Sequence, residues 1–218
     1  MSKKPSMRLL LISLCLFCFT SLSAYDYSIL RGEEFYALYD ELATLTINVF
    51  REYPYLYDGN LESEKECLSH YFSTKNSALV VVKDKERIIG AITGIPLNET
   101  FFDCKNCFVE NNLPMEEIFY LGEITLLKEY RGQGIGARMY ALFEEFVREN
   151  KIYKEIAFCE VVPPKNDPRC PSDYFCLDRF WTKRGYIKNP DWVTQFSWKE
   201  LSSQEKFYHP MVFWSKKL

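Results

Sequence analysis

Lys128-Glu-Tyr-Arg-Gly-Gln-Gly-Ile-Gly-Ala137 is the most informative segment of this 218-residue chain. It follows an apolar run over residues 118–127, typical of a buried strand. It precedes residues 139–150, whose apolar side chains recur three and four apart, as in an amphipathic helix. Its three glycines stand at alternate positions before that helix, and glycine allows backbone conformations that other residues avoid. The segment therefore predicts a cradle of backbone N–H groups for a phosphate or pyrophosphate, at the positive end of a helix dipole.

Two common phosphate-binding loops do not fit this segment. It has no Lys-Ser/Thr pair, which excludes a P-loop. Gly132-x-Gly134-x-x-Ala137 matches a loose dinucleotide fingerprint, with Glu160 as the ribose-binding acid. However, four polar residues separate the apolar strand from the first glycine, where a Rossmann turn is tight. Only 58 residues follow Glu160, too few for the remaining units of that fold. The Rossmann interpretation is therefore rejected on architecture.

Outward from this loop, the pattern predicts one α+β domain without repeats or linkers. We expect strands at residues 25–30, 77–83, 87–94, 118–127, 153–162 and 192–198, with a last one at 211–214. Helices are expected at residues 32–49, 62–72, 139–150 and 172–183. Residues 97–117 read as an irregular, polar-aromatic insertion.

The loop and its surroundings resemble the GNAT superfamily of acyl-CoA-dependent N-acyltransferases. Arg131-Gly-Gln-Gly134-Ile-Gly136 matches the signature Arg/Gln-x-x-Gly-x-Gly/Ala, and the resemblance covers about residues 25–215. Residues 180–186, 196–199 and 210–214 are similar to a bacterial subfamily whose substrate is unassigned. The resemblance implies a three-layer α/β/α fold around a central mixed, mostly antiparallel sheet.

The resemblance also implies acetyl-CoA as the co-substrate. Amides of the loop would hold the pyrophosphate of CoA, and backbone groups at the end of the preceding strand would align its pantetheine arm. One free amide there would also steady the oxyanion. Arg131 would assist the phosphates, unless it is an ordinary exposed arginine. The implied binding residues are Leu126, Leu127, Arg131, Gly132, Gln133, Gly134, Ile135, Gly136 and Ala137.

Acyl transfer to an amine requires a base, because a protonated amine cannot attack. Glu123, which faces the expected acyl end, is the first candidate, and Glu160 is the second. The alternative is that both are ordinary strand-edge carboxylates, which we favour for Glu160. Many relatives place a tyrosine, as general acid, where this chain has Trp181. Tyr174 or Tyr186 would then substitute, or the thiolate of CoA leaves unaided, since a thiol has a pKa of about 8.5.

The expected function is transfer of an acetyl group to a primary amine of a small molecule or a protein. Tyr53, Tyr55, Tyr57, Asp58 and the 97–117 insertion would receive a cationic acceptor, or would simply pack onto the core. The alternative function is a catalytically silent GNAT domain that binds CoA or a partner protein. Trp181 is the feature that supports this alternative. The sequence does not indicate the oligomeric state.

Residues 1–24 resemble a secretory signal peptide, which leaves the domain at 25–218. A basic start is followed by an apolar run over residues 9–20 and by small residues up to Ala24. That run is shorter than the roughly 20 residues of a membrane span, so we expect no stable span after cleavage. The leader predicts a secreted or periplasmic protein. An uncleaved or misassigned leader would leave the protein in the cytoplasm, where acetyl-CoA is found.

Composition and net charge also indicate which classes of partner the domain does not bind. Hydrophobic residues make up 47% of the chain, which suits a globular domain. The net charge is −3, and the three basic residues of the leader leave −6 for residues 25–218, so we expect no nucleic-acid partner. Six cysteines follow the leader. The sequence leaves open whether a Cys104–Cys107 or a Cys170–Cys176 disulfide forms. We expect no metal, because the CxxC lacks a second pair of ligands.

Overall fold

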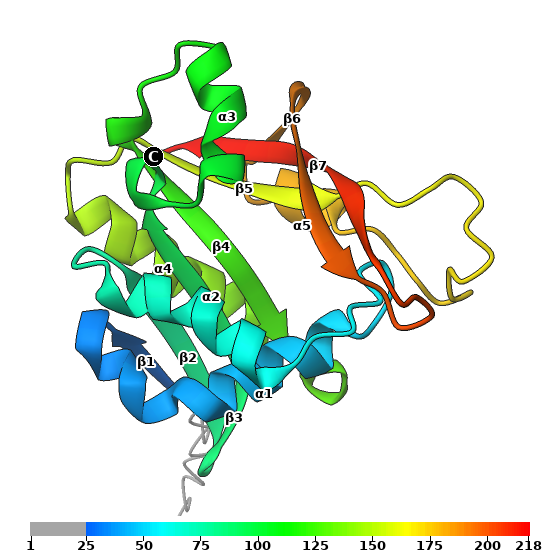
Figure 1. Ribbon diagram of the computed structural model, residues 1–218. Coiled ribbons are helices and arrows are strands. Elements are labelled where there is room, and N and C mark those ends of the chain that lie inside the picture. Colours follow the sequence, from blue (N-terminus) through cyan, green and yellow to red (C-terminus); the bar gives the residue numbers. More distant parts are fainter. Residues whose placement is uncertain (1–24) are drawn as a thin grey trace, which may run out of the picture.

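A seven-stranded sheet crosses the part of the chain that the computed structural model describes, residues 25–218 (Figure 1). The leader expected at residues 1–24 lies outside these residues and stays a prediction. The strands are β1 (Asp26–Leu30), β2 (Ala78–Asp84), β3 (Arg87–Pro96), β4 (Ile118–Leu126), β5 (Glu155–Val161), β6 (Ile187–Lys199) and β7 (Lys206–Lys217). Their order in the sheet is β1-β2-β3-β4-β5-β7-β6. All neighbours are antiparallel except β4 and β5.

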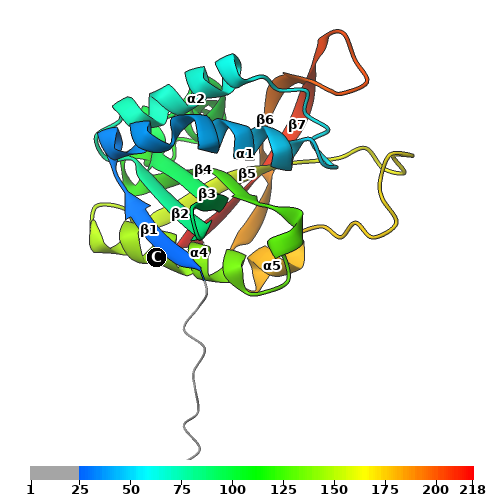
Figure 2. The same ribbon diagram turned by 90° about the horizontal axis from the view of Figure 1, so that it is seen from below.

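Helices cover both faces of the sheet. The α-helices are α1 (Tyr39–Phe50), α2 (Leu61–Ser73), α3 (Phe102–Glu110), α4 (Ile135–Glu149) and α5 (Asp178–Thr182). Short 3₁₀ helices occur at Gly32–Leu38, Leu97–Glu99, Met115–Glu117 and Lys128–Tyr130. Figure 2 shows α1 and α2 on one face of the sheet and α4 and α5 on the other. The predicted α+β fold of three layers around a mixed, mostly antiparallel sheet is confirmed.

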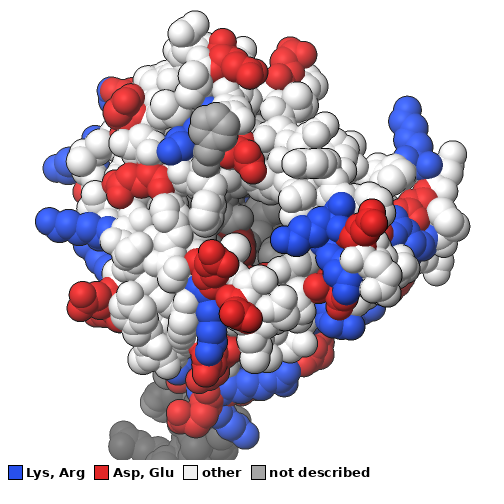
Figure 3. Space-filling model, viewed as in Figure 1, with Lys and Arg blue, Asp and Glu red and all other residues white. Residues whose placement is uncertain are grey.

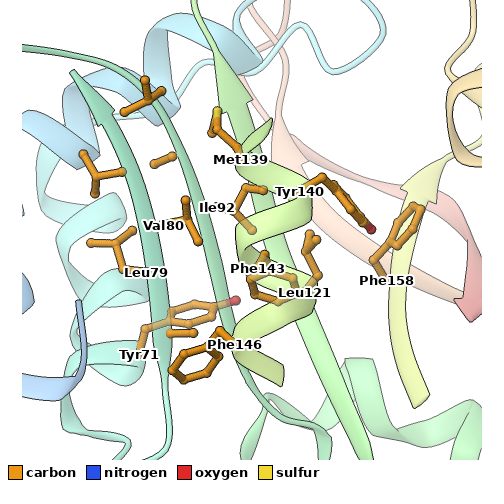
Figure 4. Packing of buried hydrophobic residues seen from close by; sticks show 14 of the residues in the cluster. Tyr71, Leu79, Val80, Ile92, Leu121, Met139, Tyr140, Phe143, Phe146 and Phe158 are labelled. Carbon is orange, nitrogen blue, oxygen red and sulfur yellow. The ribbon is translucent and has the colours of Figure 1, made fainter. Parts of the chain in front are cut away.

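The main core lies between the sheet and its helices. In α4, Met139, Phe143 and Phe146 recur at helical spacing and turn toward Ile92 and neighbouring residues of the sheet (Figure 4). Gly94 on β3 makes this close approach feasible, because an added Cβ would lie 2.7 Å from the Phe143 ring. A second cluster lies between α3 and the strands β4, β5 and β7. Burial of these apolar surfaces is the main force that fixes the layers.

The pairing of β4 with β5 is short. Only Ile118, Phe119 and Tyr120 pair with β5, in parallel register, although both strands run on for several residues. Figure 1 shows the two strands diverging beyond that point. Parallel neighbours need a crossover connection, and α4 supplies it, so the glycine loop lies where β4 ends and α4 begins.

Two predicted segments were wrong. Residues 172–183 form only the short α5, because Phe175 and Leu177 are exposed and no packing stabilises a longer helix there. Residues 97–117 are not irregular, since they include α3. Its inward face consists of Cys104, Cys107 and Phe108, and cysteine buried as a small apolar residue conceals the helical stripe in the sequence.

Other expectations concern the cysteines, metals and membranes. All six cysteines of residues 25–218 are free thiols, so neither disulfide left open by the sequence is formed. The same residues hold no group of three His, Cys, Asp or Glu that is arranged to bind a metal. None of the helices described there is long and apolar enough to cross a bilayer.

Candidate active site

The divergence of β4 and β5 leaves hydrogen-bonding groups of β4 facing a gap. Successive backbone groups of a strand point to opposite edges. The Leu127 N–H donates to Ile89 on the β3 side at 2.9 Å, so the N–H and C=O of Leu126 point toward β5. The Leu126 C=O accepts a bond from Arg131 Nε at 3.0 Å, and its N–H faces the gap. Figure 3 shows a hollow over this part of the molecule, with charged side chains on its rim.

A β-bulge in β4 sets the direction in which the Glu123 side chain points. Thr93 of β3 pairs with Glu123, whereas Gly94 pairs with Leu121, so Gly122 is the extra residue. The Glu123 N–H donates to the Thr93 hydroxyl at 3.1 Å. A bulge of this kind redirects the side chains beside it. The Glu123 carboxylate consequently points to the α1–α2 face, where it accepts a hydrogen bond from Thr46 Oγ1 at 3.1 Å.

The surroundings of Glu123 favour its protonated form. Burial and the negative charge of Glu64 raise its pKa to about 8, against an ordinary value of 4.5, and the Thr46 bond opposes this shift. No lysine, arginine or histidine of the described residues forms an ion pair with Glu123 or Glu64. A carboxyl group with a pKa near the working pH is suited to general-base catalysis.

Glu160 lies on the opposite face of the sheet. Its carboxylate accepts bonds from Trp181 Nε1 of α5 at 3.2 Å and from Lys188 Nζ at 3.1 Å. Burial raises its pKa, while the Lys188 bond and charge lower it. A carboxylate that is neutralised by its own lysine is typical of a structural ion pair. The structure therefore does not bring Glu160 together with Glu123 on one face.

Of the tyrosines considered as a general acid, Tyr186 lies on the opposite face of the sheet from Glu123. Tyr186 is 2% exposed and packs against Tyr140 of α4, and burial raises its pKa far above the ordinary value. Trp181 is buried beside the same rings. Tyr174 lies at a different place, edge-on to Tyr53, and burial raises its pKa to about 12. Of the two tyrosines, only Tyr174 is near the predicted acceptor loop.

The glycine loop has the geometry that an anion cradle requires. Gly132 and Gly134 have φ angles of 76° and 83°, and an added Cβ at either would meet nothing within 4 Å. Gly134 is the N-cap of α4, and no side chain caps the first turn of the helix. The N–H groups of Ile135, Gly136 and Ala137 in that turn are therefore left for a ligand or water. The side chains of Ile135 and Leu127 are buried, so only their backbones are available.

The side chains of the loop are held by neighbouring groups. Arg131 forms a two-bond ion pair with Glu52, at 2.7 and 3.2 Å, besides its bond to Leu126. Gln133 donates to the Glu129 carbonyl and accepts a bond from the Tyr25 hydroxyl. In this arrangement Arg131 fixes the loop to the end of β4 and to the segment after α1.

A groove of about 420 Å³ continues from the loop along α4 toward the end of α5. The residues that line it are Ala137, Tyr140, Ala141, Glu144, Lys183 and Arg184. Sequence reasoning missed the two basic residues, although a Lys-Arg pair just before Gly185 was visible. They add positive charge to the same side of the molecule as the first turn of α4.

The tyrosine loop, residues 53–58 after α1, packs against β6 and α2. Trp198 Nε1 of β6 donates to the Tyr55 carbonyl at 2.9 Å, and Asp58 forms ion pairs with Lys199 and Arg51. Burial raises the pKa of Tyr55, and the charges of Glu160 and Glu123 raise it further. The Tyr57 hydroxyl donates to Glu64. The 97–117 insertion contacts β6, where Thr194 donates to the Asp103 carbonyl.

Several solved structures with a similar fold are described as acetyltransferases. A candidate acetyltransferase of Acinetobacter baylyi is 14% identical, with a TM-score of 0.57 and coverage of 90% of this chain and 94% of that chain. A ribosomal-protein-alanine N-acetyltransferase of Brucella melitensis is 13% identical, with a TM-score of 0.56 and coverage of 88% and 99%. A GNAT-family acetyltransferase of Staphylococcus aureus is 14% identical, with a TM-score of 0.56 and the same coverage. At these identities the likeness shows the fold alone.

Sequence comparison assigns the family. A comparison with curated proteins found no match. The family model described as the acetyltransferase (GNAT) family matches residues 35–172, which include the tyrosine loop, Glu123 and the whole glycine loop. Because this match spans more than half of the chain and the sheet diverges where the loop begins, the chain belongs to the GNAT acetyltransferase family.

Proposed function

We propose that the chain transfers an acetyl group from acetyl-CoA to a primary amine. The observation that carries the proposal is the position of Glu123, a carboxyl group with a pKa of about 8, on the strand whose Leu126 N–H faces the gap. A base and an oxyanion donor on one strand meet the two requirements of amine attack on a thioester. The acceptor is a small molecule or a protein amine.

The residues present fit acetyl-CoA. The open space at Gly132 and Gly134 and the uncapped first turn of α4 suit a pyrophosphate. Lys183 and Arg184 supply further positive charge along the groove. When bound, acetyl-CoA supplies the acetyl group as an activated thioester.

The chain itself supplies proton transfer and orientation. Glu123 accepts the proton that an ammonium group must lose before its nitrogen can attack. The Leu126 N–H donates to the carbonyl oxygen on which negative charge develops. Trp181 has no acidic proton and is engaged with Glu160, so it donates none to the leaving group. A thiol with a pKa of about 8.5 leaves readily as the thiolate without such an acid.

The proposal is tested by calorimetric titration with acetyl-CoA and by release of free CoA over a panel of amines. We expect binding together with turnover on at least one primary amine. Glu123→Gln should keep the binding and lower kcat by about 10²–10⁴, the usual contribution of a general base. Glu116→Gln, at an exposed position, is the matched control and should leave both unchanged.

Two other results would contradict the proposal. Binding without turnover on any amine would favour the catalytically silent domain. The absence of binding would exclude a role for acetyl-CoA altogether.

For the place of action, we propose export to a secreted or periplasmic location, directed by residues 1–24. The basic start and short apolar run support this, and the alternative is a cytoplasmic enzyme with an uncleaved leader. N-terminal sequencing of the native protein after cell fractionation distinguishes the two. An intact Met1 in the cytosol would contradict export.

A further inference from the structure

Arg131 ties the glycine loop to the end of β4 and to Glu52, which follows α1. Its Nε donates to the Leu126 C=O at 3.0 Å. Its two terminal nitrogens donate to the two carboxylate oxygens of Glu52, at 2.7 and 3.2 Å. A guanidinium is a rigid, planar group, so these three bonds fix its plane. The start of the glycine loop is therefore held against both β4 and Glu52.

Glu52 also supports the tyrosine loop. Its backbone C=O accepts hydrogen bonds from the N–H groups of Tyr55 and Leu56, at 3.1 and 3.0 Å. One residue thus holds Arg131 with its side chain and the first turn of the tyrosine loop with its backbone. Any change in the position of Arg131 is therefore passed to that turn through a single residue.

The tyrosine loop continues to the opposite side of the gap. Tyr57 forms a β-bridge with Glu200, just after β6, and the Asp58 N–H donates to the Lys199 C=O at 2.8 Å. Figure 1 shows this segment, between α1 and α2, beside the tip of the β6–β7 hairpin. Because β6 joins the sheet through β7 on the β5 side, residues 52–58 connect the two sides of the gap.

We propose that Glu52 is a positioning residue for the transfer. Through Arg131 it holds the tyrosine loop in a fixed relation to the glycine loop, so that a diphosphate bound at the glycine loop also orders the tyrosine loop. The part of this inference that concerns turnover rests on the proposed function.

The coupling follows from the position of Arg131 in the chain. Arg131 immediately precedes Gly132, whose backbone belongs to the proposed phosphate cradle. A diphosphate that bonds to the loop amides restricts this backbone, and so keeps the Arg131 side chain where it meets Glu52. Because one partner is already ordered, the ion pair forms at a lower entropy cost and holds the tyrosine loop more firmly. Reciprocally, an acceptor that orders the tyrosine loop strengthens binding of the diphosphate.

The competing explanation is an ordinary surface ion pair. The side chains of Arg131 and Glu52 are 41% and 37% exposed, and pairs of this exposure contribute little to folding stability. A change in stability would therefore not reveal the role of Glu52. The response of the tyrosine loop to a ligand separates the two explanations, because an ordinary surface pair transmits no such response.

The test is hydrogen exchange of the backbone amides, followed by NMR, with and without CoA, which carries the diphosphate. In the wild type, CoA should slow exchange of the Tyr55 and Leu56 N–H groups by about two- to fivefold, the range that one exposed ion pair can transmit. In Glu52→Gln, calorimetric titration should still show CoA binding, but the slowing should be lost. Equal slowing in Glu52→Gln and the wild type would overturn the proposal, as would CoA binding without slowing in the wild type.

The matched control is the neighbouring residue. Arg51 pairs with Asp58 of the tyrosine loop, at 3.9 Å, rather than with the glycine loop. Arg51→Gln should therefore keep the slowing by CoA. Loss of the slowing in this variant as well would overturn the specific role of Glu52.

A variant at Arg131 changes the same contact from the other side. Arg131→Lys keeps the positive charge but cannot make three bonds from one planar group. The slowing by CoA should fall well below the wild-type value, and full slowing in this variant would also overturn the proposal.

Kinetics give a second readout wherever an amine is turned over. Glu52→Gln should raise KM for the amine by about two- to fivefold and leave kcat nearly unchanged, because the tyrosine loop is less ordered while the reacting groups remain. A fall in kcat with an unchanged KM would contradict the positioning role.

The two proposals fail in different ways. CoA binding without turnover would contradict the proposed function, and hydrogen exchange would still decide the role of Glu52. Absence of CoA binding would contradict both, since the glycine loop would then not be a diphosphate site.

Discussion

Gly134 shows how one residue shapes the loop. Its φ and ψ of 83° and −6° belong to the left-handed region, where a side chain strains the backbone. The conformation turns the chain from the end of the 128–130 turn into the first turn of α4. Gly136, two residues on, lies inside the helix with an ordinary backbone, and a Cβ there would be 3.8 Å from Leu126.

Replacement of these two glycines should have opposite effects on stability. Gly134→Ala should lower the free energy of unfolding by about 1–2 kcal/mol, the cost of left-handed backbone with a Cβ. It should also weaken acetyl-CoA binding, because the loop amides lose their orientation. Gly136→Ala should raise the free energy of unfolding by up to about 1 kcal/mol, because alanine favours a helix interior. Urea denaturation and calorimetric titration measure both effects, and equal stability of Gly134→Ala and wild type would contradict the first.

Some site residues could be predicted from sequence and others could not. The spacing of the glycines identified the loop, and the position of Glu123 on the preceding strand made it a candidate. Thr46 could not be found, because its hydroxyl reaches Glu123 only through the packing of α1 on the sheet. Tyr186 looked suitable from its position in the chain, but the sheet separates it from Glu123.

At the scale of elements, the bulge in β4 sets the geometry of the site. It inserts Gly122 opposite the Thr93–Gly94 step and brings Tyr71 of α2 onto the strand without a side chain between them. The absence of a Cβ at Gly122 therefore fixes how closely α2 approaches β4.

A Cβ at Gly122 should disturb this contact. Gly122→Ala would place a methyl group 1.9 Å from the Tyr71 hydroxyl and should cost about 1–3 kcal/mol, as overpacking does. Tyr71→Phe in the same chain should restore part of the loss, because the hydroxyl is the nearest atom. A double-mutant cycle by thermal unfolding measures the coupling. Simple additivity of the two changes would contradict the contact.

Strands were predicted more successfully than short helices. The valine-rich hairpin of β2 and β3 and the long stripe of α4 carry their own periodic signal in the sequence. By contrast, α3 depends on buried cysteines, and α5 is only five residues long, so tertiary contacts decide both. The long β6 and β7 extend beyond their apolar centres because they pair with each other, and a single strand does not reveal that pairing.

At the scale of the whole molecule, the raised pKa of Glu123 that suits catalysis lowers the stability of the fold at high pH. Burial raises the folded-state pKa of Glu123 to about 8, above its ordinary 4.5. A raised pKa means that the protonated group contributes stability, fully present below about pH 4.5 and lost as the pH rises through 8. A site tuned for proton transfer thus weakens the fold at alkaline pH.

This linkage predicts a pH-dependent effect of Glu123→Gln. The variant should be nearly as stable as the wild type at pH 5 and more stable at pH 9, because glutamine never acquires the buried charge. Urea denaturation of both proteins over this range measures the difference, and the comparison removes contributions from groups that they share. A difference that stays constant with pH would contradict the raised pKa.

The short ladder between β4 and β5 has a further consequence for self-association. A strand without a neighbour usually lies at the outside of a sheet, where it can recruit a strand from another molecule. Here the unpartnered parts of β4 and β5 face each other inside the sheet, with α1 and α2 on one side and α4 and α5 on the other. A foreign strand would have to displace one of these layers to reach them. The fold thus keeps unpaired backbone groups available to a slender ligand while it shields them from aggregation.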